Sequence, residues 1–289
     1  MKRIINVSKE LGSTIAYVQG RGGNSSIKKG THMFVKASGV LLKHVSERDF
    51  IDCIYKDITE FFVVESPVKN KDNALLTIVD NAIIQGNSIG KPSLKTGLHA
   101  IIPSKYIIHT HSVYANVFNC MTNSEKYLGA LLTNYAYEVI PYQNPGYYLA
   151  KYIYDLQLKY APPSVLFLQN HGLVIHGNNL SKVVKLHKEI NDILQNFIYD
   201  ATGLSFDVRN EFQKMDKHFF PDSIVYSSVS KDDITEKNEK EFYEILSAST
   251  FIKNVVVALK ETPVFISSDN VMYIQNMERE KHRMNLIRT

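Results

Sequence analysis

The sequence has little cysteine and no long apolar run, and each shortage excludes a class of protein. Cys53 and Cys120 are isolated, without the CxxC spacing of a zinc knuckle or a redox pair, so we expect two buried thiols. No stretch reaches the roughly eighteen consecutive apolar residues of a membrane helix, and the basic N-terminus meets polar residues before any apolar signal region develops. We therefore expect a soluble cytoplasmic protein with no membrane partner.

The sequence also has a low net charge and no internal repeats. The formal net charge of +4 is spread along the chain without a long basic run, which predicts that nucleic acid is not a partner. No internal repeat or low-complexity tract is present, which argues against a solenoid or linker-joined modules. With 289 residues, 44% hydrophobic and 21% charged, the chain is typical of a folded globular protein. Its length favours one enlarged α/β domain with an appended segment.

Hydrophobic periodicity predicts a mixture of helices and mostly antiparallel strands up to residue 203. Helical spacing is found over residues 8–18, 74–85, 93–102, 114–121, 147–160 and 181–199. Strands are predicted as a hairpin of 25–28 with 32–36, a pair of 50–55 with 61–65, single strands at 106–111 and 138–142, and a hairpin over 165–175 that turns near 170–172.

Beyond residue 203 the structural signals become sparse. A helix is predicted over 239–247, a strand over 264–267 that turns at Asp269-Asn270 into a second strand over 271–274, and a surface helix or docking tail over 276–288. We therefore predict two parts, a domain of residues 1–203 and a small α+β extension of residues 204–289, called the C-terminal segment below.

Three histidines form the candidate metal site. His109 and His111 are two residues apart on a predicted strand, so both imidazoles project from the same face. His171 lies at a tight turn between two apolar strands. Three imidazoles with an open fourth position are the arrangement of a catalytic zinc site. A His-x-His pair also occurs by chance, and His99, one helix upstream, is a further candidate.

A glycine- and serine-rich loop is a candidate anion site. Backbone N–H groups and hydroxyls of Gly22-Gly23-Asn24-Ser25 and of Ser38-Gly39 suit a phosphate, and Ser93 at a predicted helix N-terminus would add another contact. The alternative is that glycine and serine merely form turns and that Ser93 is an ordinary helix cap.

Taken in order, these motifs resemble the class II aldolase/adducin family, typified by zinc-dependent fuculose-phosphate and rhamnulose-phosphate aldolases. The resemblance extends from the first helix to about residue 200. The matching stretches are Gly23-Asn24-Ser25-Ser26, Ala37-Ser38-Gly39, Pro92-Ser93-Leu94-Lys95 through His99, His109-Thr110-His111-Ser112 and Asn170-His171-Gly172-Leu173.

The resemblance implies a three-layer α/β/α domain around a largely antiparallel sheet, assembled as a homotetramer with active sites near subunit boundaries. It implies that His109, His111 and His171 bind Zn²⁺ or another divalent metal. It also implies that a sugar-phosphate-like substrate is held at five positions, which are Gly23, Asn24, Ser38, Gly39 and Ser93. In such aldolases zinc stabilises the enediolate left when a carbon–carbon bond of a ketose phosphate breaks.

Lys95 is the main departure from the family. The PSxE pattern of the family places an acid/base glutamate where this chain has Lys95, and no Asp or Glu lies between Asp80 and Glu125. Burial beside a metal cation would lower the pKa of a lysine, so a neutral Lys95 could serve as general base or as metal ligand. Tyr114, just after the metal strand, is a candidate phenolic acid, although packing is the ordinary role of tyrosine.

The leading functional hypothesis is therefore a zinc-dependent lyase of the class II aldolase type, acting on a sugar phosphate or a similar polyhydroxylated ketose. Epimerisation, dehydration and decarboxylation on the same scaffold are alternatives within the enzyme class. Outside it, an adducin-like interaction module without catalysis is the alternative that Lys95 favours, whereas the retained histidines favour an enzyme.

Overall fold

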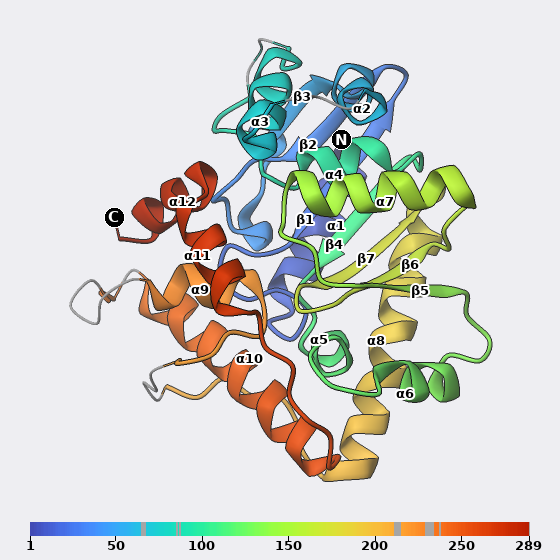
Figure 1. Ribbon diagram of the computed structural model, residues 1–289, viewed down its shortest axis with the longest axis vertical. Helices are drawn as coiled ribbons and strands as arrows, with labels where there is room; N and C mark the ends of the chain where they lie inside the picture. The colour runs from blue at the N-terminus through green and yellow to red at the C-terminus, as the bar shows by residue number, and fades with distance from the viewer. Residues whose placement is uncertain are drawn as a thin grey trace.

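A seven-stranded sheet lies at the centre of the computed structural model, which describes residues 1–64, 68–84, 86, 88–210, 215–228, 234–236 and 238–288 (Figure 1). The strands are β1 (Asn24–Lys29), β2 (His32–Lys36), β3 (Phe50–Ile54), β4 (Tyr106–Thr110), β5 (Tyr137–Ile140), β6 (Val165–Leu168) and β7 (Gly172–Gly177). Their order in the sheet is β3-β2-β1-β4-β7-β6-β5. The β5–β6 pair is parallel and the other five pairs are antiparallel, which confirms the predicted largely antiparallel sheet.

Helices cover both faces of the sheet. Because successive strand residues point to opposite faces, Ile107 of β4 belongs to one hydrophobic cluster and Ile108 to the other. The first face is covered by α2 (Tyr55–Val63), α3 (Lys71–Asn81), α4 (Thr96–Ile101) and α7 (Tyr147–Lys159). The second face is covered by α1 (Lys2–Ser13), α5 (Val113–Asn119), α6 (Ser124–Leu131) and α8 (Leu180–Thr202). The predicted three-layer α/β/α architecture is therefore confirmed.

The C-terminal segment is helical where the structure describes it. Its helices are α9 (Pro221–Ser227), α10 (Glu239–Ala258), α11 (Ser268–Asn276) and α12 (Glu278–Arg288). Ile245 and Val255 of α10 are fully buried in the same cluster as Phe118 of α5 and Ile198 of α8. The division of the chain after residue 203 stays a prediction, and the shared cluster shows how closely the two parts pack.

The predicted strand pair 264–267 and 271–274 is wrong, because the residues expected to form its turn begin a helix instead. The Ser267 side chain accepts a hydrogen bond from the Asn270 backbone N–H, and Asp269 lies in the first turn, where a negative charge is favourable. Burial of Ile274 then fixes α11 against the core. The expected α+β character of the extension is replaced by helices in its described part.

The predicted strand over 61–65 is also wrong within the described residues, since Phe61 to Val63 lie in α2 and Val64 caps it; residue 65 is outside the described part. β-Branched and aromatic residues favoured a strand, but burial follows a helical period. Ile58 and Phe62 are buried four residues apart, whereas Val63 and Val64 are 63% and 68% exposed. The first helix is also shifted, running over Lys2–Ser13 rather than 8–18.

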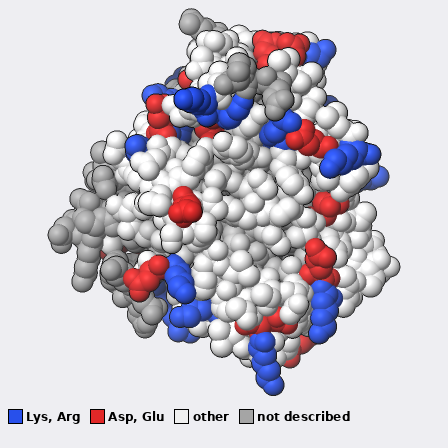
Figure 2. Space-filling model, viewed as in Figure 1, with Lys and Arg blue, Asp and Glu red and all other residues white. Residues whose placement is uncertain are grey.

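Charges on the face shown in Figure 2 lie mainly around its edge, with Lys and Arg mixed among Asp and Glu and a largely uncharged centre. Within the described residues no helix is both long and apolar enough to span a bilayer.

A buried lysine joins α4 to the sheet. Lys28 of β1 is 7% exposed, and its Nζ donates to the carbonyls of Ala100, at 2.8 Å, and of Ile102. These carbonyls lie at the C-terminal end of α4, where a cation is favourable. Burial nevertheless lowers the pKa of Lys28 from 10.5 to about 7. The lysine therefore binds its proton less tightly in the folded state than in the unfolded state.

We expect this lysine to make stability rise with pH. Between pH 7 and 10.5 the Lys28 amine is mostly protonated in the unfolded chain and mostly neutral in the folded chain. The free energy of unfolding should therefore rise with pH in this range, by at most about 1.4 kcal/mol per pH unit. Above about pH 8.5 ionisation of unfolded cysteine acts in the opposite direction, so the window is pH 7 to 8.5. The free energy of unfolding of metal-free protein, measured with urea at several pH values, should rise less steeply with pH for Lys28→Met than for the parent. Lys29→Met, at the exposed neighbouring residue, is the control. An equal dependence of the free energy of unfolding on pH in all three proteins would contradict the expectation.

Candidate metal centre and anion pocket

Three chain segments meet at one end of the central strands. β1 begins at Asn24, β4 ends at Thr110 and β7 begins at Gly172. Asn24 is paired with His109, and Thr110 is paired with Leu173 across the neighbouring strand. The antiparallel register therefore places the glycine-rich loop before β1, the His-x-His sequence and the turn before β7 next to one another.

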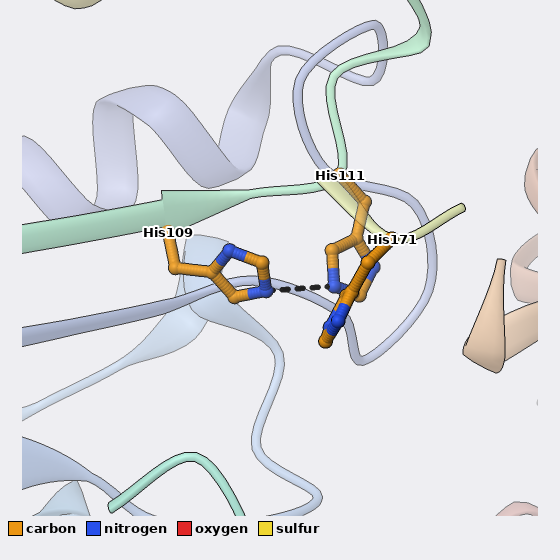
Figure 3. A group of neighbouring side chains, drawn as sticks. All are labelled: His109, His111 and His171. Carbon is orange, nitrogen blue, oxygen red and sulfur yellow. Dashed lines mark hydrogen bonds between the residues drawn. The ribbon is translucent and has the colours of Figure 1, made fainter. Parts of the chain in front are cut away.

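The predicted histidine triple converges. One ring nitrogen from each of His109, His111 and His171 lies within 4.8 Å of the other two, and all three side chains are buried (Figure 3). Nε2 of His109 faces Nε2 of His111 at 3.1 Å, while Nδ1 of His109 lies 3.2 Å from the Leu173 carbonyl oxygen. The two Nε2 atoms therefore point toward a common position.

The donor set fits a divalent metal. Two imidazole nitrogens on a tetrahedral ion, each about 2.0 to 2.1 Å from it, lie roughly 3.4 Å apart, close to the observed 3.1 Å. Within the described part of the chain, neither nitrogen of His171 has a hydrogen-bond partner, although the ring is buried. A hydrogen bond between His109 and His111 would leave His171 unsatisfied, whereas one shared cation satisfies all three rings.

Electrostatics keep the three rings neutral, which is the form that binds metal. Burial is the largest cause lowering the pKa of each ring, and the pKa values of His109 and His171 are held well below 6.5. The neighbouring rings and Lys95 lower them further. For His111 the nearby Asp222 opposes the shift, but burial prevails.

Asparagine side chains hold the turn that carries His171. Asn170 has a φ of 50°, a left-handed conformation that asparagine tolerates better than most residues. From α5, Asn116 donates to the His171 carbonyl at 3.4 Å and Asn119 donates to the Gly172 carbonyl at 2.9 Å. A Cβ at Gly172 would lie 2.3 Å from a backbone oxygen of β4, so only glycine allows this approach.

A small pocket beside the histidines contains most of the predicted anion site. Its walls include Gly23, Ser38, Gly39 and Ser93, together with Lys95. Asn24 is the exception: it is not among the lining residues, and its Oδ1 accepts a hydrogen bond from the Ser25 backbone N–H at 2.8 Å. The remaining lining residues, Arg21, Lys36, Leu94, Glu280 and Arg283, were not predicted. Two arginines, two lysines whose pKa values are lowered by burial, and one carboxylate thus line the pocket.

Two further candidates do not join the centre. Tyr114 packs its ring edge-on against Phe251 at 6.2 Å, and burial followed by the charge of Asp192 raises the pKa of its hydroxyl. We assign it no role at the metal site. His99 is fully buried with Nδ1 2.7 Å from Ser26 Oγ, and burial lowers the pKa of His99 to about 3, as in a neutral packed histidine.

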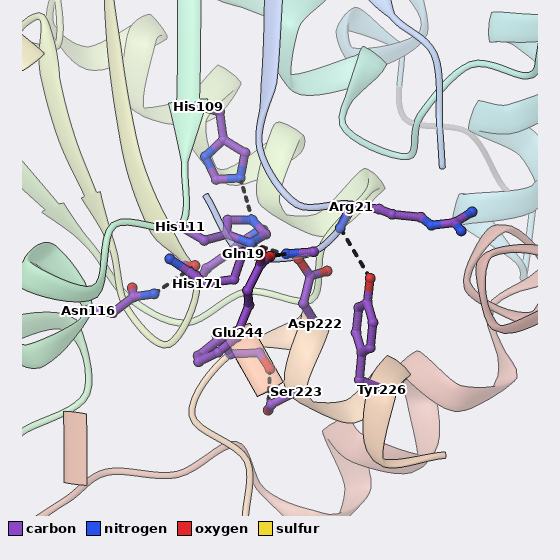
Figure 4. Close-up of polar contacts among 12 residues, drawn as sticks. Gln19, Arg21, His109, His111, Asn116, His171, Asp222, Ser223, Tyr226 and Glu244 are labelled. Atoms are coloured by element: carbon purple, nitrogen blue, oxygen red, sulfur yellow. Dashed lines mark hydrogen bonds and ion pairs between the residues drawn. The ribbon is translucent and has the colours of Figure 1, made fainter. Parts of the chain in front are cut away.

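The C-terminal segment contacts the glycine-rich loop directly (Figure 4). The Gly20 backbone N–H donates to Glu244 at 2.8 Å, and the Arg21 backbone N–H donates to the Tyr226 hydroxyl at 3.2 Å. A Cβ at Gly22 would lie 2.6 Å from a carboxylate oxygen of Asp222. Helices α9 and α10 therefore help to hold the loop that lies beside the histidines.

Comparison with known proteins identifies the fold and its family. Residues 2–198 match the class II aldolase and adducin N-terminal domain. The chain belongs to the class II aldolase and adducin family. A solved class II aldolase domain from Thermoplasma acidophilum is 25% identical with a TM-score of 0.59, and the match covers 68% of this chain and 92% of that one.

Two curated relatives of this chain are named as enzymes. An L-fuculose phosphate aldolase from Methanococcus maripaludis is 26% identical over 189 residues, 62% of this chain and 86% of the relative. An uncharacterized oxidoreductase, YuxG, from Bacillus subtilis is 25% identical over 186 residues, 61% of this chain. The matched part of this chain spans about a quarter of YuxG, 26% of its length.

Lys95 stands where the family resemblance implies a glutamate. Lys95 is 7% exposed and stands just before α4, as the N-cap residue. Burial is the largest cause that lowers its pKa; the charges of Asp222 and Glu280 oppose the shift and that of Arg283 adds to it. Lys95 is in turn one of the causes that lower the pKa values of His109 and His171.

Proposed function

We propose that this chain is a metal-dependent lyase of the class II aldolase type, which cleaves a ketose phosphate or a similar polyhydroxylated ketose. The observation that carries the proposal is the convergence of three buried, neutral imidazoles beside a pocket lined by arginine and lysine side chains. A divalent ion, zinc by family resemblance, would be held by His109, His111 and His171. When bound it supplies Lewis-acid stabilisation of the negative charge that carbon–carbon cleavage creates. A homotetramer is the proposed assembly.

The pocket side chains support an anionic substrate group. Arg21 and Arg283 supply fixed positive charge, and the Gly23 and Gly39 backbone lies at the same pocket. Lys36 is 2% exposed, and burial followed by the charges of Arg283 and Lys95 lowers its pKa to about 7. A phosphate there would favour the protonated form of Lys36, so the lysine can adjust its charge to the ligand.

Lys95 supplies the proton-transfer group. Retro-aldol cleavage removes a proton from a substrate hydroxyl, breaks the adjacent carbon–carbon bond and returns a proton to the carbon that keeps the electron pair. Burial favours the neutral amine of Lys95, and a neutral amine can accept the first proton at Nζ. The same Nζ–H can then donate to the carbanionic fragment, so the lysine performs the task of the family's glutamate.

The experiment is a paired measurement of metal content and turnover. Purified protein is stripped with a chelator, reloaded with zinc, and assayed with a panel of ketose phosphates for aldehyde release. The expected result is one zinc per chain and aldehyde release that disappears on stripping and returns on reloading. Protein that binds no divalent metal would overturn the proposal.

A non-catalytic, adducin-like module is the second candidate, and the inverted charge at Lys95 is the observation that favours it. Full zinc binding without turnover of any ketose phosphate would support this candidate. An epimerase, dehydratase or decarboxylase on the same scaffold would instead consume substrate without releasing an aldehyde by retro-aldol cleavage. Product analysis of the same reactions by mass spectrometry therefore separates the three outcomes.

A further inference from the structure

A buried carboxylate of the C-terminal segment lies directly behind one of the three histidines. Asp222, in the first turn of α9, is completely buried, and its Oδ2 lies 2.8 Å from Nδ1 of His111 (Figure 4). The two atoms are at ion-pair distance, and neither has a hydrogen-bond partner among the described residues. Because Nε2 of His111 faces His109, Nδ1 is the ring nitrogen on the side away from the shared metal position.

The second oxygen of this carboxylate is also occupied. Arg283 of α12 donates to Asp222 Oδ1 at 2.7 Å and to Glu280 Oε2 at 2.8 Å, and all three side chains are buried. A buried charge is tolerated when it is paired and hydrogen-bonded. Burial alone would raise the pKa of Asp222, but Arg283 and His111 outweigh it and hold the pKa well below its usual range. Asp222 is therefore a carboxylate fixed in place by α12.

We propose that Asp222 is a positioning residue of the metal centre, which accepts the Nδ1 proton of His111 and thereby makes Nε2 the metal-binding atom. A neutral imidazole carries one proton, so fixing it on Nδ1 directs the Nε2 lone pair toward His109 and His171. A carboxylate behind a histidine also makes the ring a stronger ligand. The inference rests on the proposed function only in requiring that the chain binds a metal.

Asp222 also contributes a negative charge to the site that contains Lys95 in place of the glutamate implied by the family resemblance. Arg283, which holds Asp222 at 2.7 Å, lines the same pocket as Lys95. The buried centre therefore gains a negative charge from α9 where the family's glutamate is absent. This carboxylate lies outside residues 2–198, the part matched by the family domain, so the C-terminal segment completes the centre.

The test is the zinc affinity of Asp222→Asn, measured by competition with a chromophoric chelator. Asparagine keeps the size of the side chain but removes the charge, and we expect affinity to fall by roughly 10- to 100-fold, the usual cost of losing such a partner. The cobalt-substituted protein should also change its visible absorption spectrum, because His111 loses its fixed orientation. A structural defect far from the metal would leave that spectrum unchanged.

Asp80→Asn is the matched control. Asp80 of α3 pairs with Arg279 of α12 at 2.7 Å, so its replacement loosens the same helix without touching the histidines. We expect parent and control to bind zinc equally. Equal affinity and spectra for the parent and Asp222→Asn would overturn the inference while leaving the proposed function standing. A parent chain without zinc binding would overturn both.

A second measurement covers the case in which Asp222→Asn does not fold. A crystal structure of the zinc-loaded parent, with the metal located by anomalous scattering, shows which nitrogen of His111 binds. Nε2 as ligand, with Nδ1 still on Asp222, is the expected result. Nδ1 as ligand, or Asp222 itself bound to zinc, would contradict the positioning role.

Discussion

Replacement of His171 by alanine is expected to abolish metal binding and, with it, ketose phosphate cleavage. The ring supplies one of three converging donors, and both of its nitrogens lack any other partner in the buried centre. Loss of a metal-binding side chain should lower zinc affinity by more than the roughly 10- to 100-fold decrease expected when a residue that only hydrogen-bonds to such a side chain is replaced. Metal content by mass spectrometry after gel filtration should fall from one zinc per chain to nearly none.

His176→Ala is the control for this experiment. His176 is a buried histidine of β7, but its Nδ1 lies 2.8 Å from Ser104 Oγ and it takes no part in the triple. It should keep one zinc per chain. Full metal content in the His109→Ala, His111→Ala and His171→Ala variants alike would remove the basis for a metal centre here.

Replacement of Lys95 by methionine is expected to separate metal binding from turnover. Methionine keeps the length of the buried side chain but cannot carry a proton, so kcat should fall by about 10²- to 10⁴-fold, the range of general acid–base catalysis. Zinc content should stay at one per chain, because Lys95 is not one of the three side chains that converge on the metal position. The measurement is kcat and zinc content on the same preparation.

Lys91→Met provides the matched control, since Lys91 is exposed and four residues earlier in the chain. It should keep the parent's kcat. Unchanged kcat in Lys95→Met would show that the lysine has no part in proton transfer. Lys95→Glu adds a further comparison: aldolase activity gained by this variant would indicate a decayed enzyme, whereas loss of the native activity would support a chemical role for lysine.

The strands that carry the site were predictable because their signals are local. The β-branched run before His109 predicts β4, and alternation of side chains predicts that His109 and His111 project together. The turn at His171 also follows from flanking apolar strands. The resemblance to a family then placed Gly23 and Ser93 at one pocket, as the structure does.

The carboxylate behind His111 could not be predicted in the same way. Asp222 belongs to no motif and lies about a hundred residues from the strand it serves, so no local pattern marks it. The available signal was indirect: a buried lysine beside a cation calls for a compensating negative charge. Arg283 and Glu280 likewise sit in a polar helix whose sequence resembles an ordinary solvent-exposed surface.

The amide of Asn170 has a consequence for how this chain can be recombined. It donates at 3.0 Å to the Phe219 carbonyl and at 2.8 Å to the Val264 carbonyl, both beyond the family domain. A chimera that exchanged the helices after residue 203 for an unrelated sequence would take away both acceptors one residue before His171. Such a chimera would therefore keep the His171 turn only if the new sequence offered two acceptors at the same positions.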